Sequence, residues 1–173
     1  MNRQATMNKC RIGVITFPIG SKASVIPLSN LLGILNCLAS QVYTITGNAG
    51  ADVAQKYNAL HFELINYTSG SNTITRICNY AKTQLAIAFR MAKISKHVGC
   101  WVFPICGGAL LPSVIIAKIL RKPVGISLAS STNMMKYQSD PFLRIVIIFT
   151  KINYFLANKI ILYSPRLITE WNL

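Results

Sequence analysis

Acidic side chains are the scarcest charged groups in this 173-residue sequence. Asp52, Glu63, Asp140 and Glu170 face 18 lysines and arginines, which gives a formal net charge of +14 at pH 7. Four scattered carboxylates offer no pair for general acid–base catalysis. The uncompensated positive charge favours an anionic partner, such as a lipid headgroup, a nucleic acid or a phosphate-bearing small molecule.

Side chains that bind metal ions are also few. The sequence has two histidines, His61 in an expected strand and His97 at an expected helix end, and its five cysteines include no C-x-x-C pair. Zinc sites need three or four such ligands, usually at short and regular spacings. We therefore expect no metal site and no cofactor, and we interpret both histidines as structural.

Motifs for nucleotides and nucleic acids are missing as well. Neither G-x-G-x-x-G nor a Walker loop ending in G-K-[ST] occurs, and there is no zinc-finger or aromatic RNA-binding consensus. The basic residues are spread singly along an apolar chain instead of forming a polar arm. This pattern favours an anionic membrane surface over nucleic acid as the partner.

The amino terminus lacks the order of features in a secretory signal peptide. Its first apolar run, residues 10–18, is only as long as a strand. The cysteines lie in apolar stretches of sequence, which predicts buried and reduced thiols. They are Cys10, Cys37, Cys78, Cys100 and Cys106. Both features predict a cytoplasmic protein.

The longest uncharged run, from Val98 to Ala117, decides the fold prediction. It is long enough to cross a bilayer as a helix. However, two prolines and the pair Gly107-Gly108 interrupt it, and basic residues flank both of its ends instead of one. We therefore interpret the run as a buried strand, a glycine turn and a helix, with a membrane-spanning helix as the alternative.

Apolar periodicity predicts strands that alternate with helices along the chain. The expected strands are residues 10–17, 41–46, 61–66, 100–104, 123–129 and 159–163. The expected helices are residues 25–40, 53–57, 73–96, a segment from 109, 141–158 and 165–171. We predict a polar extension at residues 1–9 and one α/β domain at residues 10–173. Its fold is a doubly wound, mainly parallel, six-stranded Rossmann-like sheet with helices on both faces.

Ligands of such sheets bind beyond the carboxyl ends of the strands, near the point where strand order reverses. Small residues follow the first, fourth and fifth expected strands, where backbone N–H groups or hydroxyls could meet a phosphate or a sugar. These substrate-binding candidates are Gly20, Ser21, Gly107, Gly108, Ser130 and Ser131. The same residues also form turns and helix caps for purely local reasons, so both interpretations stay open.

Two stretches carry a resemblance to a known family. Residues 109–124 (ALLPSVIIAKILRKPV) and 159–173 (KIILYSPRLITEWNL) resemble the amino-terminal domain of GT-B glycosyltransferases, and more narrowly family 4. The resemblance implies transfer of a sugar from a nucleotide-sugar donor, with Gly20 and Ser21 bordering the cleft. Many relatives have a histidine after the fifth strand, where this chain has Ala129, so we assign no catalytic residue.

A GT-B enzyme also needs a second α/β domain, which holds the nucleotide sugar and an acidic pair. The resemblance therefore implies the acceptor-side half of a transferase, ending at the start of a helix that would lead to a missing second domain. The chain would be a fragment or one subunit of a split enzyme, like the two-protein N-acetylglucosaminyltransferases, and would be inactive alone. A noncatalytic α/β binding or interaction module is the alternative.

The expected helix 141–158 is apolar nearly all round, which predicts a helix that is deeply buried or lipid-facing. Together with bases on the long helix 73–96, it could dock on an anionic bilayer and meet a lipid-linked or glycan acceptor. The predicted membrane-surface residues are Lys82, Arg90, Lys93, Lys96, Arg144 and Lys151. This predicts a peripheral protein on the cytosolic face of a membrane, whereas a core helix with a solvated basic face is the alternative.

Overall fold

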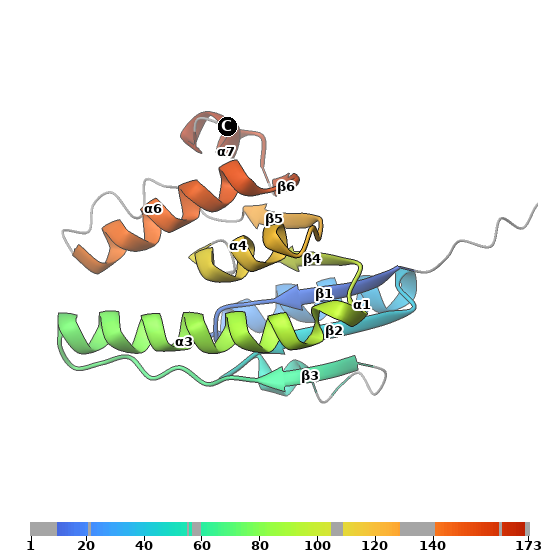
Figure 1. The fold of residues 1–173 in the computed structure, drawn as a ribbon, viewed down its shortest axis with the longest axis horizontal. Helices are drawn as coiled ribbons and strands as arrows, with labels where there is room; N and C mark the ends of the chain where they lie inside the picture. The colour runs from blue at the N-terminus through green and yellow to red at the C-terminus, as the bar shows by residue number, and fades with distance from the viewer. Residues whose placement is uncertain are drawn as a thin grey trace, which may run out of the picture.

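The computed structural model describes residues 10–20, 22–54, 56, 60–104, 109–128, 141–162 and 164–171. Within these residues, six strands form one sheet in the order β3-β2-β1-β4-β5-β6, and every neighbouring pair is parallel (Figure 1). The strands are β1 (Arg11–Ile15), β2 (Gln41–Thr46), β3 (Leu60–Leu64), β4 (Cys100–Phe103), β5 (Val124–Leu128) and β6 (Lys159–Leu162). The predicted doubly wound Rossmann-like α/β fold is confirmed.

Helices cover both faces of the sheet. They are η1 (Lys22–Ser24), α1 (Val25–Leu38), α2 (Ala51–Ala54), α3 (Thr73–Ile94), η2 (Ser95–His97), α4 (Leu111–Ile119), α6 (Pro141–Leu156) and α7 (Arg166–Trp171). Helices α3, α4 and α6 lie side by side on the face turned to the viewer in Figure 1, and α1 lies behind the sheet. Strand order reverses between β1 and β4, after α3 has carried the chain back across the sheet.

Successive residues of the central strands are buried in two separate cores, because side chains of a strand point alternately to opposite faces. In β1, Val14 packs towards α1, whereas Ile15 belongs to the core beneath α3 and α4. The larger core also holds Trp101 and Phe103 of β4, both fully buried. A strand buried on both faces needs continuous apolar sequence, which explains why the strands are so easily recognised in this chain.

Helix α3 starts at a well-formed cap and extends past the ends of the strands. The Asn72 side chain accepts a hydrogen bond from the Thr75 amide (2.9 Å), and the Thr75 hydroxyl accepts one from the Asn72 amide (3.2 Å). This capping box satisfies amides that the first helical turn leaves unpaired. The amino-terminal halves of α3 and α6 project beyond the carboxyl edge of the sheet (Figure 1).

The apolar run from Val98 to Ala117 divides as its prolines and glycines predict. It forms β4, whose Trp101 is fully buried, and later α4, which has Pro112 in its first turn, where a missing N–H costs nothing. In the part of the chain that the structure describes, there is no helix whose length and apolar character would let it cross a bilayer. The interpretation of this run as strand and helix is confirmed.

Several element ends differ from the sequence prediction by one to three residues. Helix α1 ends at Leu38 because the next residue, Ala39, is already extended. Helix α3 ends at Ile94 and tightens into the 3-10 turn η2. Helix ends commonly fray or tighten in this way, because their last carbonyls have no partner in the helix. These differences leave the topology unchanged.

The prediction of buried thiols is wrong for three of the cysteines. Cys10, Cys37 and Cys78 are exposed and Cys100 is half-buried, while Cys106 lies outside the described residues. Apolar neighbours in the sequence did not bury them, because these cysteines lie at strand starts or on the outward sides of helices. Burial, and then the neighbouring Cys10, raises the pKa of Cys100 to about 11 from an ordinary value of 9.0.

That shift predicts an ordering of thiol reactivity. Only the thiolate reacts with iodoacetamide, so a rise from 9.0 to about 11 lowers the thiolate fraction roughly 100-fold at pH 8. We expect Cys100 to be alkylated far more slowly than the exposed Cys37 and Cys78, as peptide mass spectrometry over time would measure. The Cys100 rate should keep rising with pH up to about 11. Equal rates for Cys100 and Cys37 at pH 8 would contradict this ordering.

Candidate functional site

The loops after β1, β2 and β3 are tied together at the carboxyl edge of the sheet. Ile19 pairs with Asn48 in an isolated parallel bridge, in which the Ile19 amide donates to the Gly47 carbonyl (3.3 Å) and the Ala49 amide donates to the Ile19 carbonyl (3.2 Å). A Cβ on Gly47 would lie 1.8 Å from the Ile65 carbonyl oxygen, so only glycine permits this approach. The three loops therefore form one platform.

Asn48 makes the hydrogen bonds that join the loop after β2 to the segment after β3. Its side chain accepts a hydrogen bond from the Tyr67 amide (2.8 Å) and donates one to the Tyr67 carbonyl (3.0 Å), while its own amide donates to the Asn66 side-chain oxygen (2.8 Å). Its φ of 50° lies in the left-handed region, which asparagine tolerates better than most residues. One residue thus joins the second loop to the third.

We expect Asn48→Ala to destabilise the protein by about 2 to 3 kcal/mol. Two hydrogen bonds contribute about 1 kcal/mol each, and alanine adds about 1 kcal/mol of left-handed strain. Asn48→Gly removes the same hydrogen bonds without that strain, so it should recover about 1 kcal/mol. Urea unfolding measures both variants, and equal losses for glycine and alanine would contradict the strain contribution.

Aromatic side chains from four segments meet next to this platform. The Phe17 ring, just after β1, lies 4.9 Å from Tyr67 and 5.4 Å from Tyr80, measured between ring centroids. Tyr80 of α3 lies 5.1 Å from Phe142 and 6.5 Å from Phe149, both on α6. We call these five residues the aromatic cluster. The cluster places apolar side chains at the carboxyl edge of the sheet, at the end of β1 and beside the point where the strand order reverses.

Buried polar groups lie behind the aromatic cluster. The Tyr80 hydroxyl (3.0 Å) and the Gln84 amide (2.8 Å) both donate to the Ala109 carbonyl, and burial raises the pKa of Tyr80 well above its usual range. The Gln84 side-chain oxygen and the Ser113 hydroxyl are buried and have no hydrogen-bond partner. These groups hold α3 against the start of α4, close to where residues 105–108 join the described chain.

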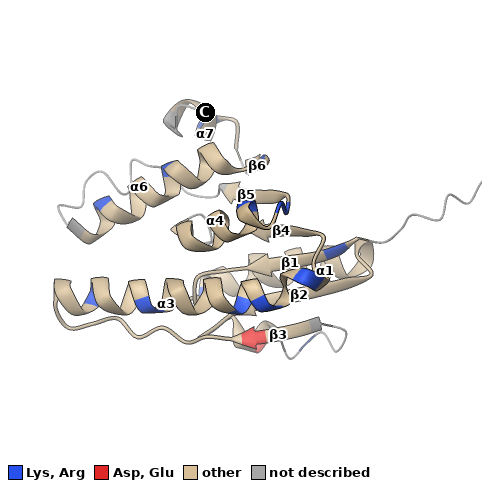
Figure 2. Ribbon diagram, viewed as in Figure 1, with Lys and Arg blue, Asp and Glu red and all other residues tan. Residues whose placement is uncertain are grey.

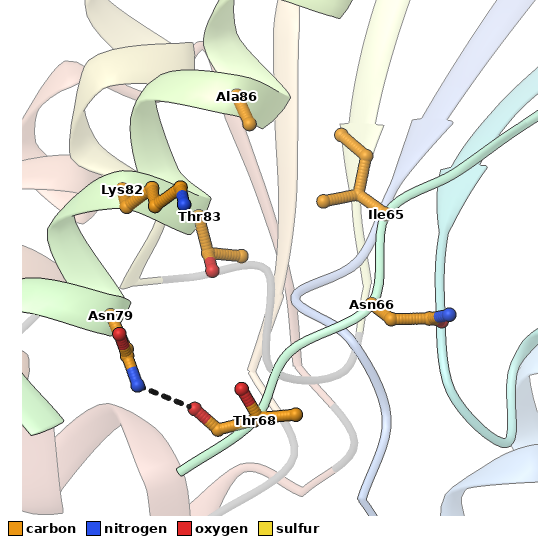
Figure 3. Close-up of a pocket in the computed structure, with 7 residues that line it drawn as sticks. All are labelled: Ile65, Asn66, Thr68, Asn79, Lys82, Thr83 and Ala86. Atoms are coloured by element: carbon orange, nitrogen blue, oxygen red, sulfur yellow. Dashed lines mark hydrogen bonds between the residues drawn. The ribbon is translucent and has the colours of Figure 1, made fainter. Parts of the chain in front are cut away.

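A pocket of about 200 Å³ opens between α3 and the segment that follows β3 (Figure 3). Ile65 and Thr68 line one side, and Asn79, Lys82, Thr83 and Ala86 of α3 line the other. The Asn79 amide donates to the Thr68 carbonyl (3.1 Å) and closes one end. The Asn66 side chain turns away from α3, towards Asn48. We call this cavity the α3 pocket.

Of the six predicted substrate-binding residues, the described structure contains Gly20. Gly20 is exposed at the carboxyl edge, and a Cβ added there would meet nothing within 4 Å. Its φ is not positive, so neither strain nor crowding requires glycine at this position. The other five, Ser21, Gly107, Gly108, Ser130 and Ser131, lie outside the described residues, as does Ala129. Their assignment to a substrate stays a prediction.

The six predicted membrane-surface residues are all exposed. Arg90 pairs with Glu63 on β3, and Lys93 places its ammonium group 4.5 Å from the centroid of the Phe89 ring. Lys82 lines the α3 pocket, and Lys96 follows α3 in η2. Arg144 and Lys151 lie on the outward side of α6. The other four, Lys93, Lys96, Arg144 and Lys151, are exposed and make no ion pair with a carboxylate among the described residues. Their membrane-surface role stays a prediction.

Helix α6 is not apolar and buried all round. Its buried side carries Phe142, Thr150, Asn153 and Tyr154, whereas Ile148, Ile152 and Phe155 are exposed. Phe155 is 90% exposed. The sequence prediction left a buried helix and a lipid-facing helix open, and the structure shows one buried side and one exposed side.

The exposed sides of α3, η2, α4 and α6 combine apolar and basic residues, and we call them the helical face. Its residues are Leu85, Phe89, Lys93, Lys96, Ile115, Ile119, Arg144, Ile148, Lys151, Ile152 and Phe155. Figure 2 shows lysine and arginine along these helices and no acidic residue on them, in agreement with their sequences. A face of this composition has no internal counter-charge.

Both histidines lie far from the carboxyl edge. The His61 ring stacks on Tyr43 at 4.8 Å, and the His97 ring stacks on the same tyrosine at 6.3 Å. His61 is near the start of β3 and His97 follows α3, which places them towards the amino ends of the strands. Among the described residues, no three His, Cys, Asp or Glu side chains gather as a metal site would require. The interpretation of both histidines as structural stays a prediction.

Sequence reasoning missed the aromatic cluster and the role of Asn48. The cluster joins residues 17, 67, 80, 142 and 149, whose proximity depends on how β1, β3, α3 and α6 pack. The Gly47-Asn48 pair was a usable signal, since both residues favour unusual backbone conformations.

Comparison with known proteins places the chain in a structural class. No protein-family model matches the sequence, and no match is found among curated proteins. Solved structures do match. UGT2 of Phytolacca americana, complexed with UDP-2fluoro-glucose and pterostilbene, has a TM-score of 0.64 and 12% identity over 90% of this chain and 48% of its own.

Two further structures give the same result. A UDP-glucosyltransferase from Polygonum tinctorium has a TM-score of 0.67 and 11% identity over 95% of this chain and 49% of its own. MurG of Acinetobacter baumannii has a TM-score of 0.57 and 16% identity over 88% of this chain and 42% of its own. These are GT-B proteins, and at such low identity the likeness concerns the fold. The chain spans about half the length of the structures it matches.

Proposed function

We propose that this chain is the acceptor-side domain of a glycosyltransferase that transfers a sugar from a nucleotide-sugar donor. The observation that carries the proposal is the match of 88 to 95% of the chain to about half of each of three GT-B structures. Two of these structures are described with UDP-sugar chemistry in their names. The narrower assignment to family 4 rests on the sequence resemblance alone.

The acceptor is proposed to bind at the carboxyl edge, over the aromatic cluster. The half-buried rings of Phe17, Tyr67 and Phe149 give an apolar contact for a sugar ring or a lipid chain. The platform around Asn48 holds the neighbouring loops in place. The exposed Gly20 leaves room beside it. Ser21, Gly107, Gly108, Ser130 and Ser131 are proposed to complete this site.

The helical face is proposed to rest on an anionic bilayer and bring the carboxyl edge to a lipid-linked or glycan acceptor. Phe155, Ile119 and Phe89 are 90%, 72% and 60% exposed, so the face offers apolar side chains that can enter the headgroup region. Lys93, Lys96, Arg144 and Lys151 surround them, and each base near an anionic surface contributes about 1 kcal/mol. Four bases together supply about 4 kcal/mol of attraction, and this part weakens in salt.

The nucleotide-sugar donor is proposed to bind a further α/β domain, in the same protein or in a partner subunit. The matched structures are about twice as long as this chain, and the present chain lacks the usual nucleotide-binding motifs. We therefore expect the chain alone to give no transfer from UDP-glucose to a polyprenyl phosphate in a radiometric assay.

Separate measurements of acceptor and donor binding test the proposal. Nanodiscs that contain a polyprenyl phosphate should shift the amide NMR signals of Phe17, Tyr67 and Tyr80, whereas millimolar UDP-glucose should leave them unchanged. Nanodiscs without the polyprenyl phosphate are the control. Identical shifts with both kinds of nanodisc would favour a noncatalytic membrane-binding module. Binding of UDP-glucose at these three residues would assign the chain to the donor side instead.

A further inference from the structure

The α3 pocket combines a free cation with hydroxyl groups and no acid. Among the residues that the structure describes, Lys82 has no carboxylate partner, because the nearest acid on this side, Glu63, pairs with Arg90. In Figure 3 the Lys82 side chain lies along α3, on the side of the pocket that this helix forms. A lysine that is left unpaired beside a cavity favours an anion as its occupant.

Thr83 adds a second, independent sign of a ligand. Thr83 is 7% exposed, and its side chain lines the pocket (Figure 3). Buried helical hydroxyls usually bond to the carbonyl four residues earlier, as Thr150 does with Val146 (2.8 Å) and Ser95 with Met91 (2.8 Å). Within the described chain, Thr83 makes no such bond. The Thr83 hydroxyl therefore keeps its hydrogen-bonding capacity for a group in the pocket, which its side chain lines.

The size of the pocket limits the ligand. A volume of about 200 Å³ equals roughly seven water molecules at about 30 Å³ each, and it lies below the range of about 300 to 1,000 Å³ for drug-sized sites. The cavity holds about one small ring, so a larger ligand would place only one of its units inside it. Ile65 and Ala86 give this ring two apolar contacts, and Thr68, Asn79 and Thr83 surround it with polar groups.

We propose that the α3 pocket binds a single sugar unit that carries a negative charge. The charge faces Lys82, and the sugar hydroxyls exchange hydrogen bonds with Thr83 and its polar neighbours. A phosphorylated sugar and a uronate share this chemistry. The site adds to the proposed function without depending on it, since it contains no group that takes part in transfer and lies on the α3 side of the segment that carries Tyr67.

Titration with four small probes tests the proposal on the purified chain. We expect glucose 6-phosphate or glucuronate to bind with a millimolar dissociation constant and to shift the amide NMR signals of Lys82, Thr83 and Thr68. The stronger of the two identifies the source of the charge. Neutral glucose and inorganic phosphate should each bind at least tenfold more weakly, because glucose lacks the negative charge and phosphate lacks the sugar ring. Absence of binding by both sugar anions would overturn the proposal, and so would phosphate binding as tightly as glucose 6-phosphate.

Four variants connect the binding to the pocket. Lys82→Met and Thr83→Val keep the shapes of the side chains and should each weaken binding roughly tenfold, because each removes one hydrogen-bonding group. Thr83→Ser keeps the hydroxyl and should retain binding. Lys93→Met removes an equal charge from the outward side of α3 and should have no effect. Unchanged binding in Lys82→Met and Thr83→Val, with unfolding midpoints showing that both fold, would overturn the site.

These measurements use soluble sugars and involve no membrane, donor or transfer. Their failure would leave the proposed acceptor-side function untouched. Conversely, sugar binding at the α3 pocket would stand even if polyprenyl phosphate nanodiscs left the aromatic cluster unchanged.

Discussion

Replacing Trp101 with alanine is expected to cost about 3 to 5 kcal/mol, the usual range for removing a large buried aromatic side chain. Trp101 is fully buried in the core beneath α3 and α4, and it lies in β4 next to the central strand β1. Domains have a total unfolding free energy of about 5 to 15 kcal/mol, so this change leaves the fold marginal or lost. Urea unfolding followed by circular dichroism measures the effect.

The close contact between Trp101 and Gly13 provides a second test of the core around Trp101. A Cβ on Gly13 would lie 2.2 Å from the Trp101 ring, so the indole already occupies the space above the glycine. Gly13→Ala is therefore expected to destabilise the protein by about 1 to 3 kcal/mol through overpacking. In a Trp101→Ala background, the same change should cost less or become favourable, because the ring is gone. Additive effects of the two changes would contradict the contact.

Phe155→Ala provides the matched control for Trp101→Ala. It also removes a large aromatic side chain, but Phe155 is 90% exposed. Its loss should change the unfolding free energy by no more than about 0.5 kcal/mol, as is usual at exposed positions. A large destabilisation by Phe155→Ala would mean that other parts of the protein cover this residue in solution.

Charge reversal on α6 is expected to abolish binding to anionic vesicles. Arg144→Glu with Lys151→Glu removes about 1 kcal/mol of attraction at each position and adds a similar repulsion, about 4 kcal/mol in total. That sum corresponds to a roughly 1,000-fold weaker partition. Sedimentation with vesicles that contain 30% anionic lipid would measure it, and the binding of the unmodified chain should fall as salt shortens the range of the interaction.

The control reverses two bases on the other side of the sheet. Lys22 and Lys56 are exposed beside α1 and α2, and their replacement by glutamate changes the net charge by the same amount. Their effect on vesicle binding should be small. Equal losses for both double variants would mean that the total charge of +14, and not the helical face, attracts the vesicles.

The order of elements was predictable because the central strands have apolar residues on both faces and the helices have apolar residues at helical spacing. In β1, the alternation of Val14 and Ile15 between two cores leaves the sequence continuously apolar, a typical pattern of a buried parallel strand. In the Val98–Ala117 run, proline and glycine predicted the separation into a strand and a helix, which are β4 and α4 in the structure. These signals are local, so a single sequence carries them.

The site was harder to predict because its parts are joined only by the fold. Phe17 and Tyr80 come within 5.4 Å of each other through the crossover that α3 makes over the sheet. Nothing near either residue in the sequence indicates this contact. The exposure of Cys37 and Cys78 is a second example, because apolar neighbours do not reveal which side of a helix faces water. Gly20 follows a strand in the sequence and lies at the carboxyl edge in the structure, whereas its role in binding a substrate stays a prediction.

The strand order also determines when the strands can pair during synthesis on the ribosome. The register pairs Ile12 of β1 with Cys100 of β4, two residues separated by 88 positions (100 minus 12). At about 5 to 20 residues synthesised per second, β4 is synthesised roughly 4 to 18 s after β1. Meanwhile, β1, β2 and β3 can associate as a nascent half-sheet whose inner edge is uncovered. Chaperone capture during translation should therefore peak before residue 100 emerges and decline once β4 has closed that edge.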